Sequence, residues 1–138
     1  MKSMKSLVVI ISFLLVVSCD NKIEKEIESL NMVLMKGHDE VMPKSMNIAE
    51  VKKELIASVE NAPDSIKNAA LELSTQLQKA EDDMYAWMDN YGKAMNDVKD
   101  KNEKLKLYKG LQSEIEKIKA LTDESIAKAK TFATKQKK

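Results

Sequence analysis

The chain has 138 residues and a formal net charge of +1 at neutral pH, from 23 basic and 22 acidic side chains. Every basic residue is a lysine, so the chain lacks arginine, the side chain best suited to bidentate recognition of phosphates and bases, and nucleic acid is not an expected partner. Three glycines, two prolines, 4% aromatic and 33% charged residues predict an elongated helical protein rather than a globular one with a thick core.

The first residues have the pattern of a secretory leader. Lys2 and Lys5 precede an uncharged, mostly apolar stretch at residues 7–17. Such a stretch spans about 16 Å as a helix, at roughly 1.5 Å per residue, whereas the bilayer hydrocarbon is about 30 Å thick. It is therefore too short for an ordinary membrane-spanning helix, and residues 1–18 are predicted to be a signal peptide.

The leader ends in VVSC at residues 16–19, which resembles a lipobox, the motif whose cysteine a lipoprotein-processing system acylates. Cys19 is the only cysteine and cannot form an internal disulfide, so lipidation gives it a role in an oxidising compartment. Two or more acyl chains anchor a protein stably to a membrane. We expect a lipid-modified Cys19, a tether at residues 19–22 and a location in a bacterial cell envelope. Asp20 resembles an inner-membrane retention signal of enteric bacteria, but other phyla sort differently, so the inner and outer membranes both stay open.

A first helical arm is predicted over residues 21–61. Its apolar residues include a series at seven-residue spacing, which keeps one face of a helix toward partner helices. The series is Ile27, Leu34, Val41, Ile48, Leu55 and Ala62. The phase does not change at Pro43, whereas a true break would normally reset it, so we favour one long helix kinked near Pro43. The alternative is two helices that meet at residues 37–44.

Two further helices follow. Pro63 and Asp64 predict a turn and a helix start, and apolar residues then alternate at spacings of four and three as far as Tyr91, where Gly92 is expected to end the helix. The third helix is predicted over residues 98–135, with Leu121, Ile126 and Phe132 among its core positions. The expected fold is all-α, an extended up-down-up bundle of three helices over residues 23–135 with a frayed tail at 136–138.

No standard catalytic set is present. His38 is the only histidine, so neither the paired Glu-x-x-His motifs of di-iron bundles nor a three-histidine zinc site can be built. The sequence also lacks a glycine-rich phosphate loop and a Cys-x-x-Cys-His haem motif. Enzyme activity is therefore not expected.

The unusual feature is methionine near the single histidine and the single tryptophan. His38 and Trp87 lie at almost equal distances along the chain from the turn near Ala62, so folding the arms together should bring them to one level. Thioether and imidazole ligands suit copper(I), and a tryptophan face can lie against a bound cation, a combination that resembles the chemistry of periplasmic copper carriers though not their fold. The candidate ligands are Met35, His38, Met42, Met84 and Met88.

Two other interpretations of this cluster stay open. Methionine can fill an irregular gap beside a kink at Pro43, with Trp87 and Tyr91 as aromatic packing and no cofactor at all. A methionine-rich surface can also dock a partner protein of the envelope.

The segments at residues 38–44 (HDEVMPK) and 87–91 (WMDNY), behind a lipobox, resemble a group of small Bacteroidota lipoproteins often labelled "viral A-type inclusion protein". The resemblance covers most of the chain after the leader, and the label carries no mechanism. This chain departs from the pattern at Ser45, where we expect methionine.

The sequence thus predicts a non-enzymatic envelope lipoprotein, attached to a membrane by lipid on Cys19, that serves as a helical spacer or interaction module. The alternative is a periplasmic, copper-type metal-binding protein. The oligomeric state stays undecided.

Overall fold

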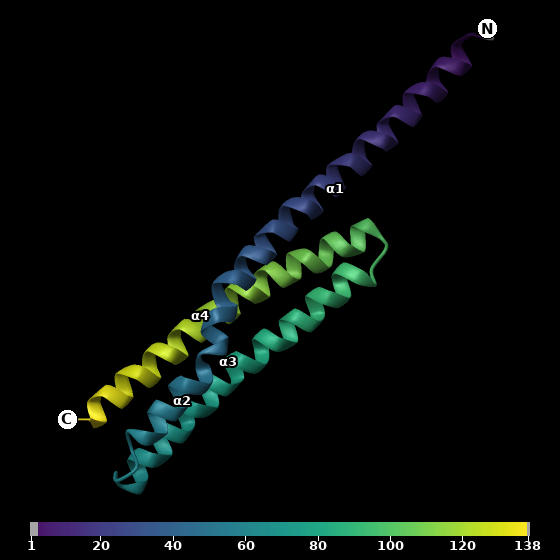
Figure 1. Cartoon of the computed structure of the whole chain (residues 1–138). Coiled ribbons are helices and arrows are strands. Elements are labelled where there is room, and N and C mark those ends of the chain that lie inside the picture. Colours follow the sequence, from purple (N-terminus) through teal and green to yellow (C-terminus); the bar gives the residue numbers. More distant parts are fainter. Residues whose placement is uncertain (1–2, 138) are drawn as a thin grey trace.

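The protein is a bundle of helices in three arms (Figure 1). The computed structural model describes the backbone of residues 3–137 and the side chains of residues 21–137. Its helices are α1 (Ser3–Met46), α2 (Ile48–Ala57), α3 (Asp64–Asn96) and α4 (Lys101–Gln136), with no strand among the described residues. The first arm consists of α1 and α2, and the expected all-α, up-down-up bundle is confirmed.

The first arm bends at Asn47 rather than at the proline. A regular helix would pair the Asn47 amide with the carbonyl of Pro43, but it donates instead to the Lys44 carbonyl at 3.1 Å, which tightens the turn. Pro43 itself lies inside α1, so the alternative of two helices meeting at residues 37–44 is wrong. Val41 and Ile48, on either side of the bend, are both fully buried, so the seven-residue phase passes through it.

The second turn of the bundle comes later than the sequence suggested. Gly92 does not end the helix, since α3 continues to Asn96. No glycine adopts the left-handed conformation that is common at a helix end. Ala94 is 4% exposed, so the seam, meaning the row of buried residues along one face of the helix, extends past Gly92. The Asp100 side chain then caps α4 by accepting a hydrogen bond from the Glu103 amide at 2.8 Å.

The two outer arms run parallel to each other. Glu24 and Glu26 of α1 pair with Lys101 and Lys109 near the start of α4, at 3.5 and 2.7 Å. The beginning of the described part of α1 therefore lies beside the turn between α3 and α4. Among the described side chains, no helix carries an apolar stretch long enough to cross a membrane.

Polar residues interrupt the core at the level of the bend. One apolar cluster contains Val41, Met84 and Ile118, and a second contains Ile48, Ala80 and Ala129. Between them in sequence lie three buried residues with hydroxyl groups, Ser45, Thr122 and Ser125. The hydroxyls of Ser45 and Thr122 are buried without a hydrogen-bond partner.

This layer corrects the core expected for α4. Leu121, Ile126 and Phe132 are only partly buried, whereas Thr122, Ser125 and Ala133 occupy the buried seam. The seam keeps its spacing of three and four from Leu111 onward, so helical periodicity rather than side-chain hydrophobicity decides which residues point inward.

Replacing Thr122 by valine should stabilise the protein. An unpaired buried hydroxyl costs about 1 to 3 kcal/mol, and valine has nearly the same shape, so we expect Thr122→Val to raise the free energy of unfolding by about 1 kcal/mol. Urea denaturation measures it. Thr131→Val, at an exposed site on the same helix, is the matched control and should change stability by less than about 0.5 kcal/mol. A loss of stability in Thr122→Val alone would mean that the hydroxyl is bonded after all.

Candidate functional site

His38 and Trp87 meet at the interface of α1 and α3. Their ring centroids lie 6.4 Å apart, with an angle of 28° between the ring planes. The prediction that these two residues fold to one level is confirmed. The chain's single histidine and single tryptophan thus form one cluster, although 49 positions separate them in the sequence.

Trp87 begins a row of stacked rings. Trp87 and Tyr91 are parallel, with centroids 5.4 Å apart and an interplanar angle of 1°, and Tyr91 contacts Tyr108 of α4 at 6.0 Å. Each aromatic pair at such distances adds about 0.5 to 1.5 kcal/mol beyond the burial of its surface. The row therefore ties α1, α3 and α4 together at one level.

Hydrogen bonds fix the row at two points. The Trp87 indole Nε1 donates to the Leu111 carbonyl of α4 at 2.9 Å, and the Tyr91 hydroxyl donates to Oδ1 of Asn31 on α1 at 2.6 Å. Burial raises the pKa of Tyr91 and of Tyr108 above their usual value, so both hydroxyls stay protonated at neutral pH. Trp87 is also almost fully buried, at 2% exposure.

The candidate methionines lie at graded depths around these rings. Met84 is fully buried in the core, whereas Met42 and Met88 are partly buried and pack against the same cluster. Met35 is 39% exposed. Met42 and Met35 thus lie beside the core rather than in it.

One ring nitrogen of His38 is hydrogen-bonded to a neighbouring carboxylate. Its side chain is 28% exposed, and Nδ1 lies 3.0 Å from Oδ1 of Asp39. An ionised carboxylate can only accept hydrogen bonds, so Nδ1 carries the proton in the neutral ring. The lone pair of the neutral imidazole is then on Nε2.

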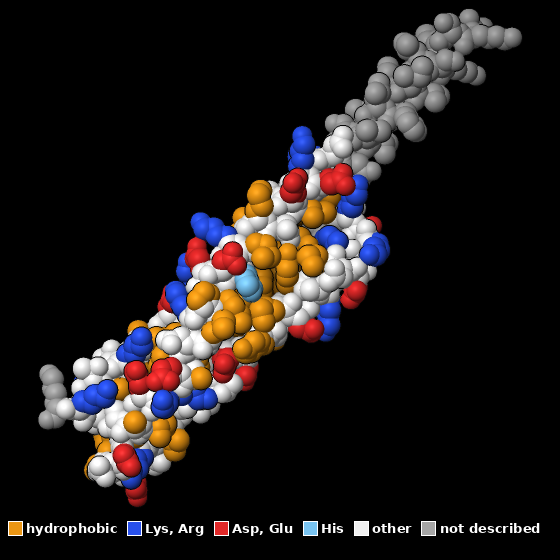
Figure 2. All heavy atoms as spheres, in the orientation of Figure 1, with side chains coloured by type: hydrophobic (Ala, Val, Ile, Leu, Met, Phe, Trp, Pro, Cys, Tyr) orange, Lys and Arg blue, Asp and Glu red, His pale blue; other side chains and the backbone are white. Residues whose placement is uncertain are grey.

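The surface around the histidine is apolar. Figure 2 shows the pale blue histidine midway along the bundle, with hydrophobic side chains along most of its border and an acidic side chain directly beside it. Ile27, Leu30, Met42, Met88 and Tyr91 are the partly buried hydrophobic residues that pack over this part of the core. Pro43, which we grouped with Trp87 and Tyr91, is exposed and does not belong to this cluster.

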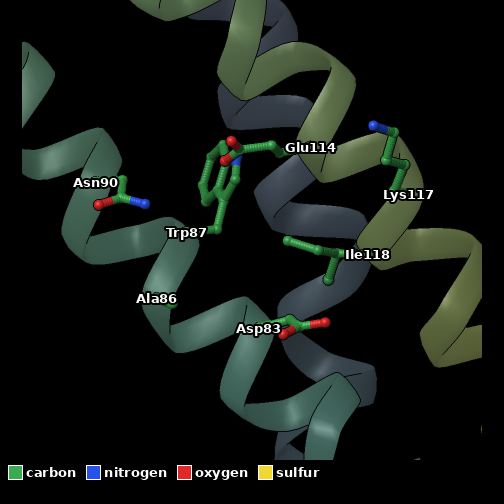
Figure 3. A pocket seen from close by; sticks show the side chains of 7 residues that line it. All are labelled: Asp83, Ala86, Trp87, Asn90, Glu114, Lys117 and Ile118. Carbon is green, nitrogen blue, oxygen red and sulfur yellow. The ribbon is translucent and has the colours of Figure 1, made fainter.

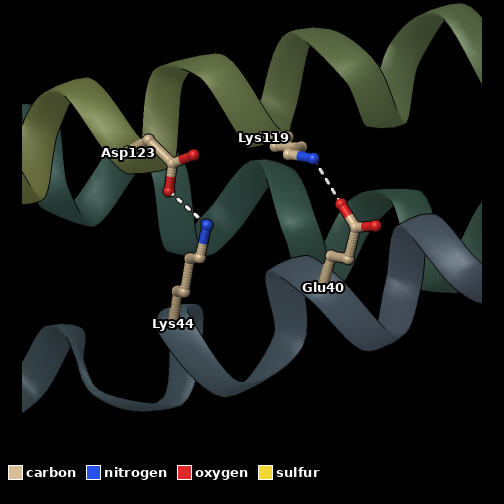
Figure 4. Close-up of polar contacts among 4 residues, drawn as sticks. All are labelled: Glu40, Lys44, Lys119 and Asp123. Atoms are coloured by element: carbon tan, nitrogen blue, oxygen red, sulfur yellow. Dashed lines mark hydrogen bonds and ion pairs between the residues drawn. The ribbon is translucent and has the colours of Figure 1, made fainter.

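The edge of α1 opposite His38 packs against α4, whereas the edge that carries His38 faces α3. A Cβ atom on Gly37 would lie 2.9 Å from Cγ1 of Ile115, so the Ile115 side chain packs directly against the backbone of α1 there. Glu40 pairs with Lys119, and Lys44 pairs with Asp123 at 2.5 Å (Figure 4). The Lys119 ammonium lowers the pKa of Glu40.

A cavity that the sequence did not suggest opens beside Trp87. It has a volume of about 270 Å³ and lies between α3 and α4 (Figure 3). Asp83 and Asn90 reach it from α3, and Glu114 and Lys117 from α4. Each of these residues is an ordinary surface position on its own helix, so only the packing of α3 against α4 identifies the cavity.

Other kinds of site are not evident in the described part of the chain. Among those side chains, no group of three or more His, Cys, Asp and Glu residues could hold a metal ion. The side chain of Cys19, with those of the leader, lies outside the described residues, and α1 runs without interruption through the predicted tether at 19–22.

No family model, curated protein or solved structure matches the chain. The resemblance to the small Bacteroidota lipoproteins therefore stays a prediction.

Two substitutions, each at one aromatic residue of the row, should show which of its two hydrogen bonds contributes more to stability. Trp87→Phe removes the buried bond to the Leu111 carbonyl and leaves a gap, and should cost about 1 to 3 kcal/mol of unfolding free energy. Tyr91→Phe removes only the bond to Asn31, at a partly exposed site, and should cost about 0.5 to 1.5 kcal/mol. Chemical denaturation followed by circular dichroism compares them. An equal or larger loss in Tyr91→Phe would contradict the central place given to Trp87.

Proposed function

We propose that the protein is a non-enzymatic lipoprotein of the bacterial cell envelope, in which the bundle serves as a spacer and interaction module held to a membrane by lipid on Cys19. The observation that carries the proposal is the sequence of residues 1–19, with a charged start, a short apolar stretch and the lipobox-like VVSC. Only five positions separate Cys19 from Glu24, the first residue among the described side chains that is seen to pair with α4, so the bundle begins almost at the anchor, which supports the proposal.

The shape of the bundle suits a spacer. The anchor would lie near the end that holds the turn between α3 and α4, since Glu24 pairs with Lys101 there. The turn between α2 and α3 and the end of α4 occupy the other end of the bundle (Figure 1). Because α3 has 33 residues, the two ends are separated by about 50 Å at 1.5 Å per residue. The apolar surface around His38 would stand between them, clear of the lipid headgroups and open to a partner protein.

Contacts among the described residues support an interaction module. His38 donates to Asp39 and stacks on Trp87. The charged residues of α1 and α4 pair with one another across the surface, as Glu40 does with Lys119. These features support a module that is organised around packing rather than around a reacting group.

Loss of the lipidated cysteine should release the protein from membranes. We expect Cys19→Ala, expressed in a bacterial host with lipoprotein processing, to incorporate no labelled palmitate and to leave the membrane fraction. Ser18→Ala, which keeps a small residue before the cysteine, is the control and should be labelled and retained like the unmodified chain. Labelling of Cys19→Ala, or the absence of any label on the unmodified chain, would rule out lipidation at this position.

A further inference from the structure

We propose that the edge of the bundle between α1 and α3 holds one soft monovalent cation of the copper(I) type, bound by His38 Nε2 and the thioethers of Met42 and Met88 beside Trp87. This inference goes beyond the proposed role as an anchored spacer and does not depend on it. It rests on how four residues from two helices are placed at one level of the bundle.

The types of ligand decide which ion fits. Calcium and magnesium take oxygen ligands, and structural zinc takes cysteine, histidine or carboxylate groups, but the described residues hold no group of three such side chains. Thioethers are soft ligands that select copper(I), and imidazole also suits copper. Silver(I), which has the same charge and similar softness, should bind in the same way.

The two helices bring these ligands to one place. His38 and Met42 are four residues apart on α1 and so share a helix face. Met88 directly follows Trp87, whose ring contacts His38. Both methionines pack against the apolar cluster that contains Trp87, which places them at the edge of a region with little water.

Asp39 prepares the histidine for this role. A metal-bound histidine typically donates its other ring N–H to a carboxylate or carbonyl group, which fixes the tautomer and the ring orientation. The contact of 3.0 Å between His38 Nδ1 and Asp39 Oδ1 is of this kind, and it leaves Nε2 as the ligand atom. The carboxylate also supplies a negative charge near a bound cation.

The other methionines differ in how deeply they are buried, and this decides whether each can contribute to the site. Met84 is fully buried inside the core, so an ion would have to enter the bundle to reach it. Met35 lies three residues before His38 on the same side of α1 and is 39% exposed, which suits a residue at the mouth of the site. Met32 is 64% exposed and lies on another face of α1, so it serves as the matched control.

Trp87 borders the site and provides a fluorescent probe of binding. The His38 ring stacks on the indole, so an ion bound at Nε2 would lie beside Trp87. Since Trp87 is the only tryptophan, the intrinsic fluorescence of the protein reports on this one position. Binding at the site should therefore quench or shift that emission, whereas binding at a distant methionine should leave it unchanged.

The test is an anaerobic titration of the full chain, held in detergent, with copper(I) in competition with a chromophoric copper(I) chelator. Cys19→Ala is the background for every variant, because it removes the one thiol that would bind copper(I) elsewhere. Met42→Leu and Met88→Leu conserve volume and should keep the fold, which circular dichroism verifies. Met32→Leu is the control.

We expect one equivalent of copper(I) to bind with a change in Trp87 emission. Met42→Leu and Met88→Leu should each weaken binding by about tenfold or more, and Asp39→Asn by about tenfold, while Met32→Leu should stay within about twofold of the parent. Failure to find saturable binding, or equal weakening in Met32→Leu and Met88→Leu, would overturn the site. Neither result bears on lipidation of Cys19, which the labelling experiment tests separately.

Discussion

Leu34, Val41, Ile48 and Leu55 are each fully buried, at intervals of seven residues, although the helix breaks between the second and the third of them. Burial of such side chains contributes about 1.5 to 3 kcal/mol each, more than the lost or altered hydrogen bonds near Pro43 are worth. The bend at Asn47 is therefore accommodated within one continuous seam. Because the buried face keeps its phase, His38 lies at the edge of α1 that faces α3, and the positions of Met35 and Met42 on the same helix follow from it.

The seven-residue series and the turn at Pro63 are visible in the sequence, and they suffice to place His38 opposite Trp87. The rest needed information that the sequence does not carry locally. Gly92 has the residue type of a helix end, but α3 continues because Ala94 extends the buried seam. Leu121 and Ile126 are more hydrophobic than Thr122 and Ser125, yet the latter face inward because the helical period of α4 puts them there. The cavity beside Trp87 depends on the packing of two helices, and no residue on either helix signals it alone.

The buried hydroxyl groups near the bend lower the stability of the bundle, whereas the aromatic rings at the site raise it. The unpaired hydroxyls of Ser45 and Thr122 weaken the core between its two apolar clusters. Nearer the turn between α3 and α4, the rings of Trp87, Tyr91 and Tyr108 strengthen it, and His38, seven residues before Ser45, stacks on the end of that row. The candidate ligands thus sit beside a row of packed rings. A rigid support of this kind is what a preorganised binding site requires.

The central claim is that the first arm, bent at Asn47, brings His38 against Trp87. Since the chain has one histidine and one tryptophan, a nuclear Overhauser experiment can observe this contact without ambiguity of assignment. We predict cross-peaks between the carbon-bound protons of the His38 imidazole and the ring protons of the Trp87 indole, beside those that join Trp87 to Tyr91. Cross-peaks between Trp87 and Tyr91 with none between His38 and Trp87 would show that α3 is correctly formed while the first arm lies elsewhere, and would contradict the account.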